Sequence, residues 1–228
     1  MVAEFPDVAV EVEAGAEGIA VGWVLAEECA NGPSPPNLEA ELRAAVAAAL
    51  AAKDSPESAA RRAAVRDMLR FGAYKPTGRG KPASEYLLNA AACGEFPAIS
   101  ALVDINNLAS VSFLLPISLV DVDLAGGGPF RVRRGREGES YVFNPSGQVL
   151  ELRDLLLAAR LPEDLPCATP VKDSQATKTH EGTRAVLALV YAPASLADEA
   201  FRAAARLAEL LTAHVGAAAE SGMESRAG

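Results

Sequence analysis

The first part of the chain alternates apolar and polar positions and then becomes continuously apolar. Residues 8–13 alternate, whereas 19–26 are almost entirely apolar. Alternation and short apolar runs are both typical of strands, and glycines occur in the intervening segment 14–18. We therefore expect the chain to open with a β-hairpin.

Beyond residue 36 the pattern predicts both helices and strands. Helices are expected over 37–53, 55–71, 82–93, 102–113 and 196–214. Strands are expected over 117–122, 130–133, 141–143, 148–152 and 185–191, with the turn residues 144–147 joining the third to the fourth. This order predicts an α+β fold, a single domain with a mixed or antiparallel sheet flanked by helices, and does not fit strict βαβ alternation.

No internal repeat and no proline-rich linker divides the chain into obvious domains. We expect residues 1–60 to form a strand-hairpin and helix lobe packed on a main domain of residues 61–215. The remaining residues, 216–228, are expected to be a disordered tail.

Composition favours a globular cytoplasmic protein. Of the 228 residues 50% are hydrophobic, and the acidic N-terminus lacks the positive region of a signal peptide. The longest apolar runs are too short to span a membrane, so no membrane partner is expected. The 3 cysteines show no C-x-x-C spacing and there are only 2 histidines, so neither a metal nor another cofactor is expected.

The net charge of −9 is unevenly distributed. Residues 1–60 hold 11 acids and 2 bases, which leaves 19 of each over the rest of the chain. Within that neutral part, seven cations and a single acid lie in residues 61–81. This cluster is either a solvated helix face followed by a polar loop or a basic surface for a nucleic acid.

Side-chain chemistry alone leaves the function open. His180 has no G-x-S-x-G elbow nearby that would support a Ser-His-Asp triad. Asp121 and Asp123 would share one face of the predicted strand, where they could bind a cation or accept hydrogen bonds from loop backbone. The glycines of 126–128 match no phosphate-binding motif in context and indicate a turn.

A series of ordered segments between residues 74 and 192 carries a family resemblance. They are Tyr74-Lys75, Pro82 to Leu88, Gly94 to Ile99, Leu102 to Ser110, Leu115 to Asp123, Gly138-Glu139 and Gln175 to Lys178 before Thr183. Their order and spacing resemble the B3/B4 domain, the tRNA-editing module of the phenylalanyl-tRNA synthetase beta subunit, which also occurs as free-standing proteins. The first sixty residues carry no comparable resemblance.

The resemblance implies a pocket that accepts an amino acid attached to the end of tRNA. The implied function is that of a trans-acting aminoacyl-tRNA deacylase, in which water attacks the ester of a mischarged amino acid without a covalent intermediate. Two alternatives are a non-catalytic tRNA- or amino-acid-binding module and a pocket for an unrelated small molecule. The chain is too short for a complete synthetase. The expected partner is the aminoacylated tRNA end, not DNA, and the oligomeric state is left open.

The matching motif positions suggest three sets of site residues. The implied catalytic positions are Asn107, Ser118 and Gln175. The implied pocket residues are Asn106, Asp104, Ser110, Pro116, Asp121, Thr177 and Lys178. Bases expected to contact tRNA are Arg66, Arg70, Lys75, Arg79 and Lys81. For Asn107 a helix cap or buried turn is the structural alternative, and for Asp104 and Asp121 it is fixing loop geometry.

Departures from the family pattern weaken the expected catalysis. Ser118 stands where the synthetase domain has a histidine, and Gln175 stands where it has a glutamate. Neither replacement is a useful general base near neutral pH. Ser100 replaces a common asparagine, and Asn89 replaces an arginine frequent in free-standing relatives. The resemblance therefore does not imply rejection of a phenolic hydroxyl.

Overall fold

The computed structural model describes residues 9–225. The helices in this part are α1 (Pro36–Ala52), α2 (Pro56–Leu69), α3 (Ala83–Ala92), α4 (Ala101–Phe113), α5 (Val122–Ala125) and α6 (Ala197–Val215), with 3-10 turns at Gly78–Gly80, Gln175–Thr177 and Ala194–Leu196. The strands are β1 (Val10–Val12), β2 (Ile19–Glu27), β3 (Ile117–Asp121), β4 (Phe130–Arg134), β5 (Ser140–Val142), β6 (Val149–Glu151), β7 (Leu156–Arg160), β8 (Leu165–Ala168), β9 (Val186–Pro193) and β10 (Ala218–Ser225). The predicted α+β class is confirmed.

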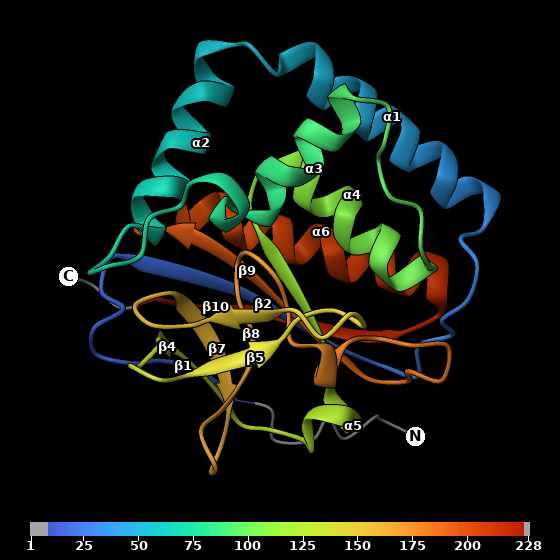
Figure 1. Cartoon of the computed structure of the whole chain (residues 1–228). Helices are drawn as coiled ribbons and strands as arrows, with labels where there is room; N and C mark the ends of the chain where they lie inside the picture. The colour runs from blue at the N-terminus through green and yellow to red at the C-terminus, as the bar shows by residue number, and fades with distance from the viewer. Residues whose placement is uncertain (1–8, 226–228) are drawn as a thin grey trace.

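The strands form two four-stranded sheets and a small hairpin (Figure 1). One sheet has the order β10-β2-β9-β3 and is antiparallel throughout. The other, β1-β4-β7-β8, is mixed because β1 pairs with β4 in parallel. Strands β5 and β6 flank the turn predicted at 144–147 and pair with each other, not with a strand of either larger sheet.

The helices cover one face of the antiparallel sheet (Figure 1). Helix α6 packs on β2, β9 and β10, α4 packs on α6 and β3, and α1 packs on α4. The approach of α6 to β2 depends on Gly22, where a Cβ atom would lie 2.6 Å from the carbonyl oxygen of Ala200. No side chain fits at that distance, so Gly22 sets how closely the helix approaches the sheet.

Two predictions at the chain ends are wrong. The first two strands do not form a hairpin: β1 pairs with β4, whereas β2 lies between β9 and β10. Because β2 is apolar on both faces, an inner position buries more of it than an edge hairpin would. The expected disordered tail forms β10 as far as residue 225, since eight residues pair in register with β2. Residues 226–228 lie outside the described part, as do residues 1–8.

Besides β10 and the 3-10 turns, three elements had no counterpart among the expected ones. Strands β7 and β8 continue the mixed sheet beyond β4. The short helix α5 begins directly after β3, with Asp121 accepting a hydrogen bond from the backbone N–H of Leu124 at 2.9 Å. The predicted strand therefore ends at Asp121, and Asp123 lies in a helix instead of on the same strand face.

The segment before α1 fixes the start of α4. The backbone N–H of Ala101 donates to the carbonyl of Gly32 at 2.8 Å, and that of Leu102 donates to the side-chain oxygen of Asn31 at 3.3 Å. The hydroxyl of Ser34 donates to the carboxylate of Asp104 at 2.6 Å. These bonds satisfy helix-terminal groups and hold α4 in place. None of the helices described is both long and apolar enough to cross a membrane.

Candidate functional site

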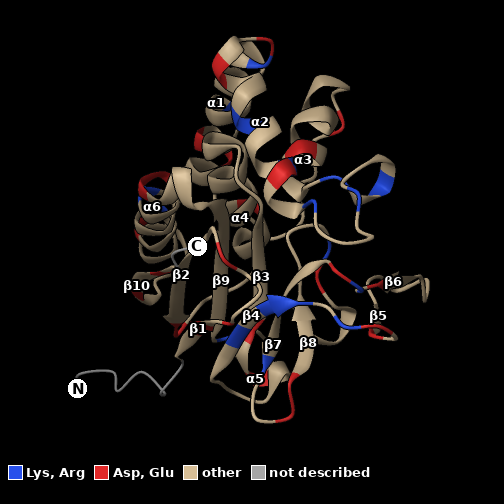
Figure 2. Ribbon diagram, turned by 90° about the vertical axis from the view of Figure 1, so that its left-hand side faces the viewer, with Lys and Arg blue, Asp and Glu red and all other residues tan. Residues whose placement is uncertain are grey.

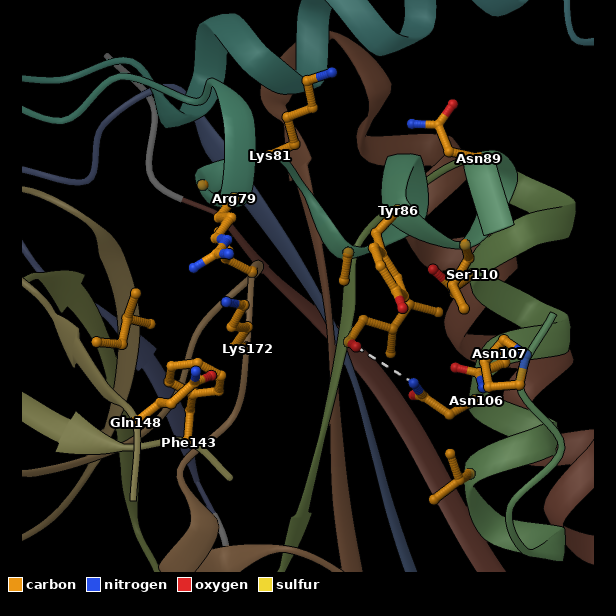
Figure 3. Close-up of a pocket in the computed structure, with 18 of the residues that line it drawn as sticks. Arg79, Lys81, Tyr86, Asn89, Asn106, Asn107, Ser110, Phe143, Gln148 and Lys172 are labelled. Atoms are coloured by element: carbon orange, nitrogen blue, oxygen red, sulfur yellow. Dashed lines mark hydrogen bonds between the residues drawn. The ribbon is translucent and has the colours of Figure 1, made fainter. Parts of the chain in front are cut away.

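A cavity of about 1150 Å³ lies between the helical layer and the β5–β6 hairpin. Figure 3 shows Tyr86, Asn106, Asn107 and Ser110 on its helical side. On the opposite side lie Arg79, Phe143, Gln148 and Lys172 (Figure 3). The volume is at the upper end of the range for small-molecule sites, so the cavity can accept a ligand larger than a free amino acid.

The helical wall combines residues of α3 with three polar side chains of α4. Asn106, Asn107 and Ser110 lie on neighbouring turns of the helix, and all three line the cavity. The Asn106 amide nitrogen donates to the carbonyl of Ile117 at 3.3 Å, and the Ser110 hydroxyl donates to that of Leu115 at 2.7 Å. Both bonds tie α4 to the approach to β3.

The amide groups of this wall retain unused hydrogen-bonding capacity. The side-chain oxygen of Asn106 is buried and has no partner in the described structure. The side chain of Asn107 makes no hydrogen bond to any residue of 9–225 and faces the cavity (Figure 3). An amide offers both donors and an acceptor, so Asn107 can bind a carbonyl, a hydroxyl or an ammonium group.

The opposite wall is cationic. Arg79, Lys81 and Lys172 line the cavity, and no Asp or Glu is found among its lining residues in the described part of the chain. The Lys172 ammonium lies 4.0 Å from the ring centroid of Phe143, a cation–π contact that orients it. Burial lowers the pKa of Lys172, and the positive charges of Arg79 and Lys178 lower it further.

Three large side chains on the cavity lining stay exposed. Tyr86 is 67% exposed, Ile99 68% and Val149 55%. Large side chains exposed on the cavity lining provide surface on which a flat ring or an aliphatic chain can pack.

The structure does not bring Ser118 and Gln175 to this cavity. On β3, Ile117 lines the cavity, so the side chain of Ser118 points to the other face of the strand. The Ser118 hydroxyl is fully buried and donates to the carbonyl of Thr169 at 3.0 Å. The side-chain oxygen of Gln175 is buried without a partner. Three residues that the sequence grouped together thus lie in two environments.

Asp173 shares the closed environment behind β3. Its carboxylate accepts hydrogen bonds from the backbone N–H groups of Leu119 at 3.1 Å and Thr169 at 3.3 Å. Burial raises the pKa of Asp173 to about 6, and these hydrogen bonds offset only part of the increase. The hydroxyl of Tyr191 is also buried there without a hydrogen-bond partner.

The other expected pocket residues make structural contacts outside the cavity lining. Asp104 accepts from Ser34 and from the backbone N–H of Ile99 at 3.0 Å, which fixes a loop. Besides capping α5, Asp121 accepts from the hydroxyl of Thr183 at 2.6 Å. The remaining three each bond to backbone: the carbonyl of Pro116 accepts from Tyr191, the Thr177 hydroxyl donates to the carbonyl of Cys167, and the Lys178 ammonium donates to that of Phe143.

Only part of the predicted basic cluster reaches the site. Arg79 and Lys81 line the cavity, whereas Arg66 pairs with Glu85 and Arg70 with Asp67. The Lys75 ammonium donates to the carbonyl of Gly72 at 3.4 Å. Figure 2 shows the basic loop before α3 on the same side of the molecule as the β5–β6 hairpin, away from α6.

Two of the three cysteines are buried, whereas Cys93 is exposed and lies outside the cavity lining. Burial raises the pKa of Cys29 to about 11 and that of Cys167 to about 12, so both thiols are poor nucleophiles. No group of three or more His, Cys, Asp or Glu side chains within 9–225 is arranged to hold a metal ion.

Comparison with protein families matches residues 76–212 to the B3/4 domain. The chain belongs to the B3/4 domain family. The match covers the cavity residues from Gly78 to Lys172 and points to a function connected with tRNA. A comparison with curated proteins gave no significant match.

Most lining residues of the B3/4 domain were not among the expected ones, including Tyr86, Phe143, Gln148 and Lys172. Phe143 and Gln148 directly flank the hairpin turn that the sequence predicts, which was the only local signal for two of them. The hydrophobic pattern could not predict that this hairpin lies against the loop before α3, because these two segments are about sixty residues apart in the chain.

Proposed function

We propose that this B3/4 domain binds the aminoacylated end of a tRNA in the cavity and hydrolyses the ester of a wrongly attached amino acid. The observation that carries the proposal is the unpaired amide of Asn107, which faces a wall of cations across the cavity. Ester and amino groups fit the amides, while the negatively charged end of the RNA fits the cations.

The chemistry requires little from the protein. An aminoacyl ester is already activated, so a cavity that orients the ester and a water molecule lowers the barrier through positioning. In the tetrahedral state, negative charge develops on the former carbonyl oxygen, and the amide N–H of Asn107 can donate to it. The side-chain oxygen of Asn107 can accept from the ammonium group or from the attacking water.

A non-catalytic module that binds tRNA or an amino acid is the second candidate. It is favoured by the lining of the cavity, in which the described residues include neither a histidine nor a carboxylate to act as general base. With Ser118 and Gln175 outside the lining, the proposal assigns them no catalytic role.

Ester loss from a panel of correctly and incorrectly charged tRNAs tests the two candidates. The deacylase is expected to accelerate hydrolysis of at least one mischarged tRNA, and Asn107→Ala is expected to slow it by roughly 100-fold, as for loss of one oxyanion donor. Asn37→Ala, on the exposed first turn of α1, removes the same group away from the cavity and is the matched control. Binding without acceleration on any tRNA would replace the deacylase with the binding module.

A further inference from the structure

Two cations of the cavity differ from most others in the molecule. Arg66, Arg70 and the fully buried Arg133 all form ion pairs with carboxylates. For Arg79 and Lys172 no carboxylate lies within 4.0 Å in the described part of the chain. Two neighbouring cations without a carboxylate partner need an explanation, because the described lining residues of the cavity include no Asp or Glu.

The position of Lys172 is fixed by its surroundings. Its carbonyl accepts hydrogen bonds from the Tyr141 hydroxyl at 2.6 Å and the Thr169 hydroxyl at 2.8 Å. Its ammonium is held over the ring of Phe143. Lys172 is therefore not a freely moving surface lysine, and its ammonium is presented to the cavity beside Arg79 (Figure 3).

Neighbouring charges leave this positive field largely intact. Lys81 contributes a third cation, although it also lies 3.4 Å from Glu85. Lys178 adds positive charge behind Lys172. The negative charge that acts on Lys178 is that of Asp173, and the Asp173 carboxylate accepts hydrogen bonds from two backbone N–H groups. In a chain of net charge −9 the cavity thus attracts anions locally.

We infer that Arg79 and Lys172 form a phosphate subsite that binds a phosphate of the RNA chain next to the terminal nucleoside. An arginine fork and an ordered ammonium are the two side chains that proteins use most for phosphate. Across the cavity, Tyr86 is 67% exposed and offers its ring to a stacked base. The inference deepens the proposed function and rests on it only for the source of the phosphate.

Binding of an uncharged, dye-labelled RNA oligonucleotide ending in CCA tests the subsite without any ester hydrolysis. Arg79→Gln and Lys172→Gln are each expected to weaken binding about tenfold and to reduce the dependence of log Kd on log salt by about 0.7, the slope per phosphate of a single strand. Lys172→Arg keeps the charge and is expected to retain most of the affinity, which separates loss of charge from misfolding.

Arg43→Gln is the matched control, because it removes one charge from an exposed arginine of α1 whose partner is Glu39 and which does not line the cavity. Equal weakening by this variant, or unchanged salt dependence in both cavity variants, would overturn the subsite. Competition by AMP or inorganic phosphate at concentrations near the oligonucleotide Kd would assign the subsite to a free phosphate. If the cavity variants bind as expected but the protein hydrolyses no charged tRNA, the phosphate subsite stands and only the proposed deacylase activity is contradicted.

Discussion

The two faces of β3 serve different purposes although their residues are neighbours in sequence. Ile117 faces an open cavity with unpaired amides and cations, whereas Ser118 faces a closed cluster in which Asp173 and Thr169 make hydrogen bonds with their surroundings. The open face has unused hydrogen-bonding groups for a ligand. The closed face uses most of its groups internally, so substitutions there should change stability and not binding.

The largest effect is expected on the closed face, from Asp173→Asn. The pKa of Asp173 in the folded protein is about 6, above its usual value of about 3.9. The folded state therefore favours the protonated acid, so this contribution to stability is complete below about pH 4 and is lost as the pH rises through 6. Asparagine cannot ionise, so the variant should gain on the order of 2 kcal/mol relative to wild type between pH 4 and pH 7.

Urea unfolding of both proteins at several pH values between 4 and 7.5 measures this difference, and subtraction removes the contribution of the other acids. A constant difference across that range would mean that Asp173 ionises normally. The closed face would then be open to solvent, and the contrast with the cavity would fail.

On the open face, Ile117→Phe should obstruct the ligand. Ile117 is 5% exposed and lines the cavity, so a larger ring extends into open space instead of into packed core. We expect CCA-oligonucleotide affinity to fall at least tenfold, about 1.4 kcal/mol, with a smaller change in unfolding free energy. Ile117→Val leaves the cavity open and should bind as wild type does; equal binding by all three proteins would place the ligand elsewhere.

The same strand shows how far sequence reasoning reaches. The position of α4 and the hairpin turn at 144–147 follow from local pattern and turn chemistry, and both agree with the structure. The choice of Asn106, Asn107 and Ser110 came from the family resemblance, and the structure places all three on the cavity lining. The grouping of Ser118 with Asn107 came from family motifs, which do not record the face of a strand. Strand alternation separates them because Ile117 takes the cavity face.

What sequence could not supply is pairing between distant segments. Strand β10 has few apolar residues. It forms a strand because its backbone pairs with β2, which lies about 200 residues earlier in the chain. The meeting of Lys172, Phe143 and Arg79 likewise joins three segments that no local pattern connects. Charge clustering therefore indicates a basic segment but cannot separate Arg79 from the ion-paired Arg66 and Arg70.

A smaller effect is expected from Ser118→Ala. Removing the hydroxyl leaves the buried carbonyl of Thr169 without its donor, which should cost about 1 kcal/mol of unfolding free energy. Oligonucleotide affinity and any deacylation rate should stay at wild-type values, because Ser118 does not line the cavity. A slower reaction at unchanged stability would return Ser118 to the catalytic role that the family motif implied.

The smallest effect is expected from Gln175→Met, which removes a buried side-chain oxygen that has no hydrogen-bond partner in residues 9–225. The side-chain oxygen of Gln175 is buried without a donor, so an apolar side chain of similar volume removes an unsatisfied acceptor. We expect a gain of about 0.5 kcal/mol in unfolding free energy, measured by urea titration, and unchanged ester hydrolysis. Loss of hydrolysis together with the gain in stability would mean that Gln175 reaches the substrate through a rearrangement of the 3-10 turn at Gln175–Thr177. The separation of Gln175 from the cavity would then hold only in the absence of a ligand.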